Sequence, residues 1–374
     1  MATIIGSNSA NVLTGTNGND VLRGLGGNDT LRGLGGNDLL DGGIGRDTMF
    51  GGFGNDTYIV NTSTDRVIEG AGGGIDRVLS SVSYALAAQV EKLTLTGVGS
   101  ISGIGNTLAN TIVGNNAGNI LKGLAGDDGL FGKAGNDRLF GSGGVDRLDG
   151  GAGNDFLDGG SGNDRMTGGL GNDVYRVNAP GDAVIEAAGG GIDRIESTIG
   201  FVLDATPQVE NLTLLGTAFF GYGNSLNNVI TGNNVGNSLS GGFGNDILIG
   251  GLGGDSLAGG PGADIFRYRS VAESTTPFPD SIELVPFQND KIDLSAIDAN
   301  VLVAGNQAFT FVGTSAFTGP GQVNYAVEID TILTFTSRTT IFANVDADAT
   351  PEFILTIPSF TIIPVIPTAG DFIL

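Results

Sequence analysis

The 374-residue chain contains no cysteine, histidine or tryptophan, and only 17 basic residues stand against 40 acidic ones. The missing cysteine and histidine exclude disulfides, thiolate nucleophiles, zinc sites built on these residues and imidazole-based catalytic triads. The formal net charge of −23 repels phosphates, so nucleic acid is not expected as a partner. No run of 18 apolar residues is present, so no membrane-spanning helix is expected, and residues 1–10 lack the pattern of a conventional signal peptide. Metal cations are the natural counter-charge.

Glycine is abundant, at 67 residues, and it marks an internal repeat. Uninterrupted nonapeptides fill residues 6–59, 105–176 and 223–267, with six, eight and five copies. Every copy begins with glycine and has an apolar residue at position eight, from Leu13 to Tyr58, from Ile112 to Tyr175 and from Ile230 to Phe266. Such a period is typical of solenoids, in which each repeat is stabilised by stacking on its neighbours.

Aspartate at position six and glycine at position four occur together in fourteen of the nineteen copies. The other five copies have asparagine at position six and no glycine at position four. Glycine reaches backbone angles that other residues avoid, and this lets carbonyl groups turn toward one point. That geometry is useful where a carboxylate completes a cage of oxygen ligands. We therefore predict that fourteen carboxylates bind metal: Asp20, Asp29, Asp38, Asp47, Asp56, Asp128, Asp137, Asp146, Asp155, Asp164, Asp173, Asp246, Asp255 and Asp264.

The GGxGxDxLx pattern resembles the RTX (repeats-in-toxin) family, which Gram-negative bacteria secrete. The resemblance implies a parallel β-roll in which six residues form a calcium-binding turn and three form a short strand. Turns on one side are then eighteen residues apart, which gives about eight complete Ca²⁺ sites. The predicted pairs are Asp20/Asp38, Asp29/Asp47, Asp38/Asp56, Asp128/Asp146, Asp137/Asp155, Asp146/Asp164, Asp155/Asp173 and Asp246/Asp264.

Calcium is expected to contribute folding energy directly. Ordering the backbone costs on the order of 1–2 kcal/mol per residue, whereas one buried leucine per repeat returns about 1.5–3 kcal/mol. Without cations, the stacked aspartates also repel one another. We expect the runs to be largely disordered at low calcium and folded at millimolar calcium.

The segments between the runs are duplicated. Residues 60–77 recur as residues 177–194, each ending in GGGIDR, and Asp65 and Asp182 stay in phase with the nonapeptides. The roll is therefore expected to extend one turn past each of the first two runs. The predicted fold is all-β: a parallel β-roll or β-solenoid with a C-terminal antiparallel β region. Its expected segments are 1–104, 105–222, 223–267 and 268–374.

The C-terminal third has less glycine and several stretches of period-two hydrophobicity, such as Val323, Tyr325 and Val327, which indicate half-buried antiparallel strands. DKIDLSAIDAN at 290–300, AGNQAFTFVG at 304–313 and the tail AGDFIL resemble the C-terminal region of serralysin-type proteases. That resemblance implies type I secretion through the C-terminal tail and an extracellular location, although residues 280–287 depart from the family's spacing. Asn344, Asp346, Asp348 and Glu352 resemble a calcium loop, but Ala349 replaces its turn glycine, and a surface turn is the alternative interpretation.

The resulting functional hypothesis is an exported, calcium-loaded roll with a structural, adhesive or scaffold role and with cell-surface or matrix partners. The chain is not expected to be an enzyme, because no histidine is present to bind a protease zinc. The alternative is a carboxylate-based polysaccharide-active enzyme on a β-solenoid, which needs an acid–base pair in a cleft. A pore-forming toxin fits less well, because the chain lacks a hydrophobic helical region.

Overall fold

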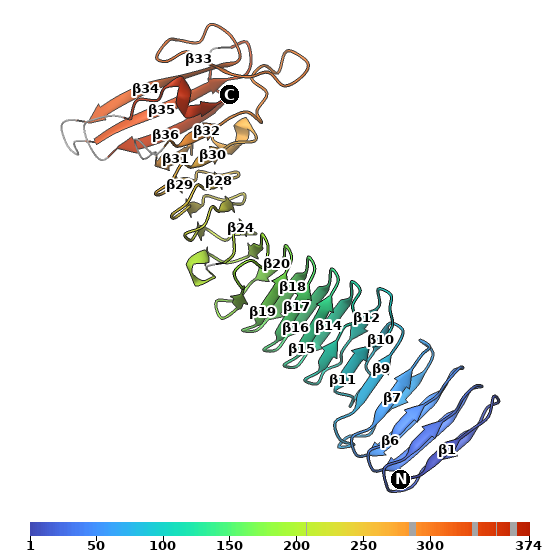
Figure 1. Cartoon of the computed structure of the whole chain (residues 1–374). Coiled ribbons are helices and arrows are strands. Elements are labelled where there is room, and N and C mark those ends of the chain that lie inside the picture. The colour runs from blue at the N-terminus through green and yellow to red at the C-terminus, as the bar shows by residue number, and fades with distance from the viewer. Residues whose placement is uncertain (207, 284–288, 331–335, 349, 360–364) are drawn as a thin grey trace. The chain divides into compact units, whose positions relative to one another are not determined.

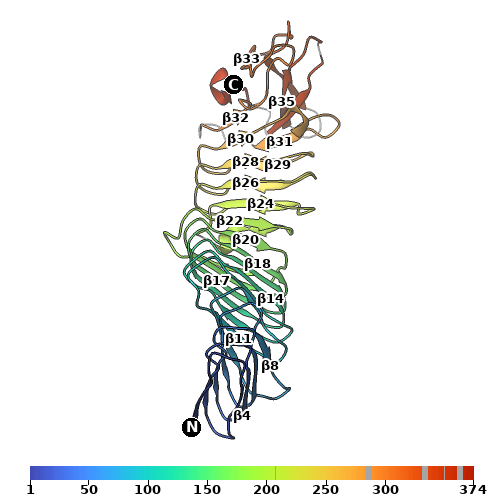
Figure 2. The same cartoon turned by 90° about the vertical axis from the view of Figure 1, so that its right-hand side faces the viewer.

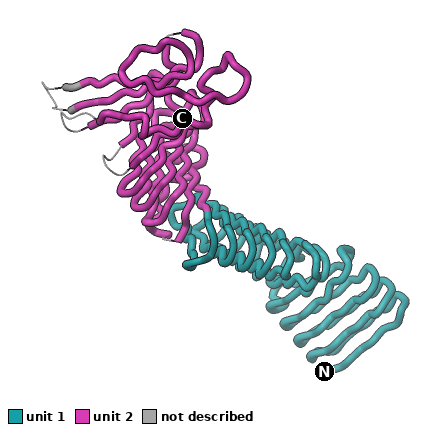
Figure 3. Tube along the Cα trace, turned by 45° about the horizontal axis from the view of Figure 1, so that its top comes forward, with its two compact units in different colours: residues 1–193 teal, residues 194–374 magenta. Residues whose placement is uncertain are grey.

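The computed structural model describes residues 1–206, 208–283, 289–330, 336–348, 350–359 and 365–374. The chain divides into two compact units, Met1–Asp193 and Arg194–Leu374 (Figure 3). Across the described ranges the secondary structure is β-strand, with only three short 3-10 helices, η1 (Leu203–Ala205), η2 (Val271–Glu273) and η3 (Ala369–Asp371). None of the helices in this described part has the length and apolar character needed to cross a bilayer. The all-β prediction is confirmed.

The first unit is a parallel β-roll whose successive strands alternate between two faces (Figure 1). The odd-numbered strands form one eleven-stranded sheet: β1 (Thr3–Ile5), β3 (Val21–Arg23), β5 (Leu39–Asp41), β7 (Thr57–Val60), β9 (Arg77–Ser80), β11 (Lys92–Leu95), β13 (Thr111–Val113), β15 (Gly129–Ala134), β17 (Arg147–Ala152), β19 (Arg165–Leu170) and β21 (Ala183–Ile185). The even-numbered strands form the opposite face: β2 (Val12–Thr14), β4 (Thr30–Gly35), β6 (Thr48–Phe53) and β8 (Arg66–Ile68), then β10 (Tyr84–Ala85), β12 (Ser102–Ile104), β14 (Ile120–Ala125), β16 (Arg138–Gly143), β18 (Phe156–Ser161) and β20 (Val174–Val177).

Strand pairing follows the eighteen-residue period of two nonapeptides. Leu130 of β15 lies beside Leu148 of β17, and Leu139 of β16 lies beside Leu157 of β18. Position eight is the inward-facing residue of each strand, and its side chain is buried in all nineteen copies. The two stacked columns of apolar side chains form the core of the roll. The neighbouring strand positions face outward, where Arg138 lies over the rings of Phe140 and Phe156.

The roll continues past the first two runs, as predicted. In the first unit, β8 pairs in parallel with β6 and places Val67 beside Met49, and β21 likewise places Val184 beside Met166. The duplicated GGGIDR segments lead into further rungs, with Val78 of β9 beside Tyr58 of β7. Segments without the nonapeptide motif therefore extend the same hydrophobic column.

The second unit begins as a parallel roll (Figure 2). One face contains β22 (Arg194–Ser197), β24 (Asn211–Leu214), β26 (Val229–Thr231), β28 (Ile247–Ile249), β30 (Ile265–Arg267), β32 (Lys291–Asp293) and β37 (Phe372–Ile373). The other face contains β23 (Phe201–Val202), β25 (Phe220–Tyr222), β27 (Ser238–Ser240), β29 (Ser256–Ala258) and β31 (Asp280–Glu283), followed by β36 (Phe353–Ser359), β35 (Thr336–Asn344), β34 (Gln322–Asp330) and β33 (Thr310–Phe311).

The predicted antiparallel region is confirmed in β34, β35 and β36, which pair in antiparallel order. Val323, Ile341 and Leu355 are its buried positions, whereas Leu333 and Phe335, part of the same pattern, lie outside the described residues. The tail does not stand apart from the roll, because β37 pairs in parallel with β32 and Phe372 is buried against Phe311. The final apolar residues therefore form a rung of the sheet.

Candidate metal sites

The fourteen predicted carboxylates occupy one repeated place, at the end of each turn and just before the inward-facing strand. Each is at most 2% exposed. In every one of the eight predicted pairs, the backbone N–H of the first aspartate donates to Oδ1 of the second. For Asp137 and Asp155 the N···O distance is 2.7 Å. The structure therefore brings together all the residues paired by the sequence analysis.

The second carboxylate oxygen has no donor in thirteen of the fourteen aspartates, Asp20 being the exception. This Oδ2 atom packs against the position-one glycine of its own turn, where a Cβ atom on Gly132 would overlap Asp137 Oδ2. The carbonyl oxygen of Gly150, from the next coil, lies 2.5 Å from the same Cβ position on Gly132. A buried carboxylate oxygen without a donor, with a carbonyl oxygen close by, is costly unless a cation lies beside it. An all-oxygen donor set of carboxylate and carbonyl fits a hard cation such as Ca²⁺.

The same thirteen turns share an unusual backbone. Their position-four glycines have φ between +103° and +159°, and their position-two residues lie between +75° and +109°. Five of these position-two residues are not glycine: Leu25, Leu34, Leu124, Lys133 and Ser142. Left-handed backbone is unfavourable for residues with a Cβ atom. The positive φ at position four explains why glycine recurs there in these turns.

Burial raises the pKa of most of these carboxyl groups above the ordinary value near 3.8, and neighbouring carboxylates add to the effect for several of them. The pKa rises to about 6 at Asp47 and Asp137 and to about 7 at Asp56 and Asp155. Each shift measures the cost of a negative charge held in the turn without a counter-charge. A bound divalent cation would remove that cost.

The turn containing Asp20 has the sequence of a binding turn but not its conformation. The backbone N–H and the hydroxyl of Thr16 both donate to Asp20 Oδ2, at 2.7 and 2.8 Å. Neither Thr16 nor Gly18 has positive φ. Local hydrogen bonds from Thr16 therefore satisfy this carboxylate, unlike the other thirteen.

The asparagine turns satisfy their own groups in a similar way. Asn119 Oδ1 accepts from the backbone N–H of Asn115 at 2.8 Å, and Asn119 Nδ2 donates to the carbonyl of Ile101 at 2.9 Å. An amide thus supplies a donor where an aspartate turn has none. This accounts for the loss of the position-four glycine in the same copies.

Further aspartates extend the ladder beyond the predicted set. Backbone N–H groups at the ends of the runs donate to the Oδ1 atoms of Asp65, Asp76, Asp182, Asp193, Asp280 and Asp290. Asp65 and Asp182 keep the eighteen-residue spacing from their partners. Asp76 and Asp193 lie 20 residues after their partners, and Asp280 and Asp290 lie 25 and 26 residues after theirs. Sequence reasoning missed the last four because insertions move them out of phase. The GGGID segments before Asp76 and Asp193 were the available signal.

Position-five side chains form a second ladder that the sequence analysis also missed. Asn136 Oδ1 accepts from the backbone N–H of Asn154, and Asn154 Oδ1 accepts from that of Asn172, both at 2.9 Å. The recurrence of asparagine at position five was the signal.

Three acidic clusters have carboxylate oxygens within 4.8 Å of one another among the described residues: Asp56/Glu69/Asp76, Asp173/Glu186/Asp193 and Asp346/Asp348/Glu352. Burial raises the pKa of Glu69 to about 8 and that of Glu186 to about 7. In the third cluster, Asp348 is exposed, and Asp346 and Asp348 accept hydrogen bonds from backbone N–H groups of their own loop. Ala349 of that loop lies outside the described residues.

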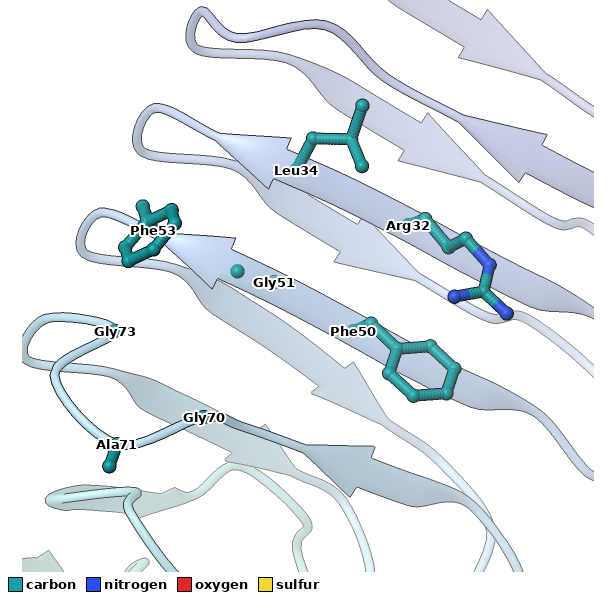
Figure 4. Close-up of a pocket in the computed structure, with 9 residues that line it drawn as sticks. Arg32, Leu34, Phe50, Gly51, Phe53, Gly70, Ala71 and Gly73 are labelled. Carbon is teal, nitrogen blue, oxygen red and sulfur yellow. The ribbon is translucent and has the colours of Figure 1, made fainter.

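An apolar depression of about 260 Å³ lies on the outer surface of the first run (Figure 4). Leu34, Phe50 and Phe53 line it, with the Arg32 guanidinium 4.6 Å from the centre of the Phe50 ring. Gly51 and the Gly70–Gly73 loop form its other wall. Its lining contains no carboxylate, although Gly51 also borders Asp56 Oδ2 of the aspartate ladder.

Comparison with protein families agrees with these features. Four copies of the RTX calcium-binding nonapeptide repeat match residues 5–40, 23–58, 104–139 and 140–175. The Peptidase M10 serralysin C-terminal family matches residues 189–366, and no protease catalytic domain was found in the chain. No curated protein matches the chain. RTX nonapeptide repeats bind calcium, and the matched residues 5–58 and 104–175 contain ten of the thirteen orphaned carboxylate oxygens. The chain contains RTX calcium-binding nonapeptide repeats followed by a serralysin-type C-terminal domain.

Proposed function

We propose that the chain is an exported calcium-binding protein that folds when its turns bind calcium outside the cell and then serves as a structural, adhesive or scaffold element. The observation that carries this proposal is the set of thirteen buried Oδ2 atoms without donors, each beside a position-one glycine. A chain folded in this way needs cations in its turns. Cells keep cytosolic calcium low, so the same chemistry delays folding until after export.

Seven of the eight predicted pairs, all except Asp20/Asp38, have an orphaned oxygen on their first member. Six further pairs have the same arrangement: Asp47/Asp65, Asp56/Asp76, Asp164/Asp182, Asp173/Asp193, Asp255/Asp280 and Asp264/Asp290. We therefore propose up to thirteen calcium sites, rather than about eight. Thirteen divalent ions carry 26 positive charges, which offset the formal net charge of −23. Bound calcium then neutralises the column of stacked carboxylates.

Two features support a binding or scaffold role over catalysis. The position-six carboxylates are enclosed in their turns, so they are poorly placed to reach a polysaccharide. The outer surface, by contrast, presents aromatic rings, with Phe53, Phe219 and Phe243 each more than 60% exposed. Exposed apolar side chains of this kind favour contacts with cell-surface or matrix partners.

Export is supported by the serralysin-type C-terminal region, which is characteristic of type I secreted proteins of Gram-negative bacteria. We propose that residues 371–374 contact the secretion machinery while the chain is unfolded, and that β37 forms afterwards. In the folded protein Phe372 is buried, so recognition of its side chain requires an unfolded or partly folded chain.

Calcium-titrated small-angle scattering with circular dichroism on the full chain tests the proposal. We expect an expanded chain with little β signal in calcium-free buffer, and a compact β-rich chain at millimolar calcium. Equilibrium dialysis on the same sample counts the bound ions. A fully β-rich, compact chain in excess chelator at neutral pH would refute calcium-dependent folding.

A further inference from the structure

The two runs of the first unit end in the same departure from the repeat. Eighteen residues after the position-one glycines Gly51 and Gly168, where another glycine is expected, the chain has Glu69 and Glu186. Each glutamate opens a loop two residues longer than a nonapeptide turn, ending at Asp76 or Asp193. The GGGID part of each loop still follows the turn pattern. In a regular turn, the Gly36 N–H donates to the carbonyl of Phe53, and in the first of these loops the Gly54 N–H donates to the carbonyl of Gly73 in the same way.

The glutamate side chain takes the place of a backbone carbonyl. In a regular turn, a Cβ on the position-one glycine would meet its own aspartate Oδ2 and the position-one carbonyl oxygen of the next coil, as at Gly132. At Gly51 the same point is met by Asp56 Oδ2, the Tyr58 hydroxyl and Glu69 Oε1. Figure 4 shows the Gly70–Gly73 loop that follows Glu69 beside the strand containing Gly51. A charged carboxylate therefore replaces a neutral oxygen.

The other groups at this point are also acceptors that lack donors. Asp56 and Asp76 are each 1% exposed, and the Oδ2 atom of each has no hydrogen-bond partner. The Tyr58 hydroxyl donates to Glu69 Oε1 and fixes the glutamate. In the second run, Tyr175 likewise donates to Glu186 Oε1 beside Asp173 and Asp193, and here it is Asp173 Oδ2 that has no hydrogen-bond partner.

We infer that Glu69 and Glu186 each complete a three-carboxylate calcium site that closes its run and binds calcium more tightly than the two-carboxylate sites within the run. The inference depends on the proposed calcium binding and adds ligands to it. Calcium affinity rises with the number of charged ligands and with the rigidity of the site. Here a third carboxylate is added and is anchored by a buried tyrosine.

The test compares Glu69→Gln, Glu186→Gln and the double variant with the wild-type full chain by chelator-competition titration. Glutamine keeps the acceptor for the tyrosine but removes the charge. We expect each single variant to lose one of the tightest sites, with its affinity lowered by roughly tenfold. Glu69→Gly restores the residue found at this position of the regular repeat, and we expect it to leave a weaker site with two carboxylates. This second variant keeps the inference testable if the glutamine variant does not fold.

Terbium luminescence gives an independent readout, because the chain has no tryptophan and Tyr58 and Tyr175 lie at the two sites. Each glutamate variant is expected to reduce tyrosine-sensitised emission at low terbium. Glu196→Gln is the matched control, since it removes one half-buried glutamate charge, paired with Arg194, that lies outside both acidic clusters. Unchanged tight calcium binding and unchanged emission in the double variant would overturn the inference. A wild-type chain that binds no calcium would instead overturn the proposed function.

Discussion

At the scale of single residues, the central feature is a carboxylate with one satisfied oxygen and one orphaned oxygen. In Asp155, Oδ1 accepts from the backbone N–H of Asp137, while Oδ2 has no donor. The hydrogen bond fixes the side chain, and the orphaned oxygen is left for a cation. A native asparagine at this position is bonded differently: Asn119 Oδ1 accepts from the Asn115 N–H of its own turn and Asn119 Nδ2 donates to the Ile101 carbonyl, so no orphaned oxygen is left for a cation.

We expect Asp155→Asn to lose about one calcium ion per chain and to lower the free energy of unfolding in calcium by roughly 1–3 kcal/mol, because carbonyl groups of the site lose their cation. Chemical denaturation at fixed calcium measures this change. Asp149→Asn is the matched control, since that carboxylate is 35% exposed and forms only a 3.6 Å ion pair with Arg147. Equal effects of the two variants would contradict the assignment of Asp155.

The position-four glycines allow a test of backbone geometry. Gly135 has φ of +103°, and a Cβ atom there would lie 2.6 Å from the carbonyl carbon of Ala117, whereas the nearest atom to a Cβ on Gly18 would be Thr16 Oγ1, at an ordinary contact distance of 3.8 Å. We expect Gly135→Ala to cost about 1–3 kcal/mol in the calcium-bound state and Gly18→Ala to be tolerated. Thermal melts in calcium give the comparison, and a similar loss of stability in both variants would argue against distinct turn conformations.

The raised pKa values predict a pH dependence. The folded-state pKa values, about 6 at Asp137 and about 7 at Asp155, lie above the unfolded value near 3.8. Protonation therefore stabilises the calcium-free fold fully below about pH 4, and this stabilisation is lost as pH rises through about 6 to 7. We expect β signal in calcium-free buffer to increase between pH 8 and pH 5.

The same linkage has the opposite sign for metal binding. Calcium must displace protons, so its apparent affinity is expected to rise with pH over the same window. Dichroism at several pH values, with and without calcium, measures both trends. A calcium affinity that is independent of pH would contradict the raised pKa values.

At the scale of elements, β37 links the proposed secretion signal to the fold. Ile292 of β32 lies beside Phe372 of β37. We expect deletion of residues 371–374 to leave the protein inside the cell. Ile292→Ala, which weakens the same pairing without changing the tail, is expected to be exported but less stable by roughly 2–5 kcal/mol.

Immunoblots of cells and medium separate the two cases. If Ile292→Ala stays inside the cell as the deletion variant does, the loss of export is caused by altered folding rather than by lost recognition of the tail. Export of the deletion at the wild-type level would remove the role of residues 371–374.

The regular elements were predictable because nonapeptide phase specifies both the inward residue and the ligand. The buried position of Leu139 and the ladder position of Asp137 both follow from the nine-residue period. The count fails where the chain inserts residues, so the ladder positions of Asp76 and Asp280 were not found. It also fails where a side chain competes locally, as Thr16 does for Asp20. These contacts depend on three-dimensional neighbours that no period encodes.

At the scale of the whole molecule, charge and folding are coupled. A chain with a formal net charge of −23 stacks buried carboxylates in columns, and in the proposed function calcium supplies the balancing charge. The proposed division at 104, 222 and 267 stays a prediction. The two compact units each contain rolls with this ladder, so calcium is expected to stabilise both.

The account depends most directly on an ion between consecutive turns, and a crystal grown in millimolar calcium tests this. Anomalous difference density is predicted beside Asp137 Oδ2, shared with the turn that carries Asp155 and in contact with the Gly150 carbonyl. A well-ordered map in which Asp137 and Asp155 contact only water, with no ion between their turns, would contradict the account.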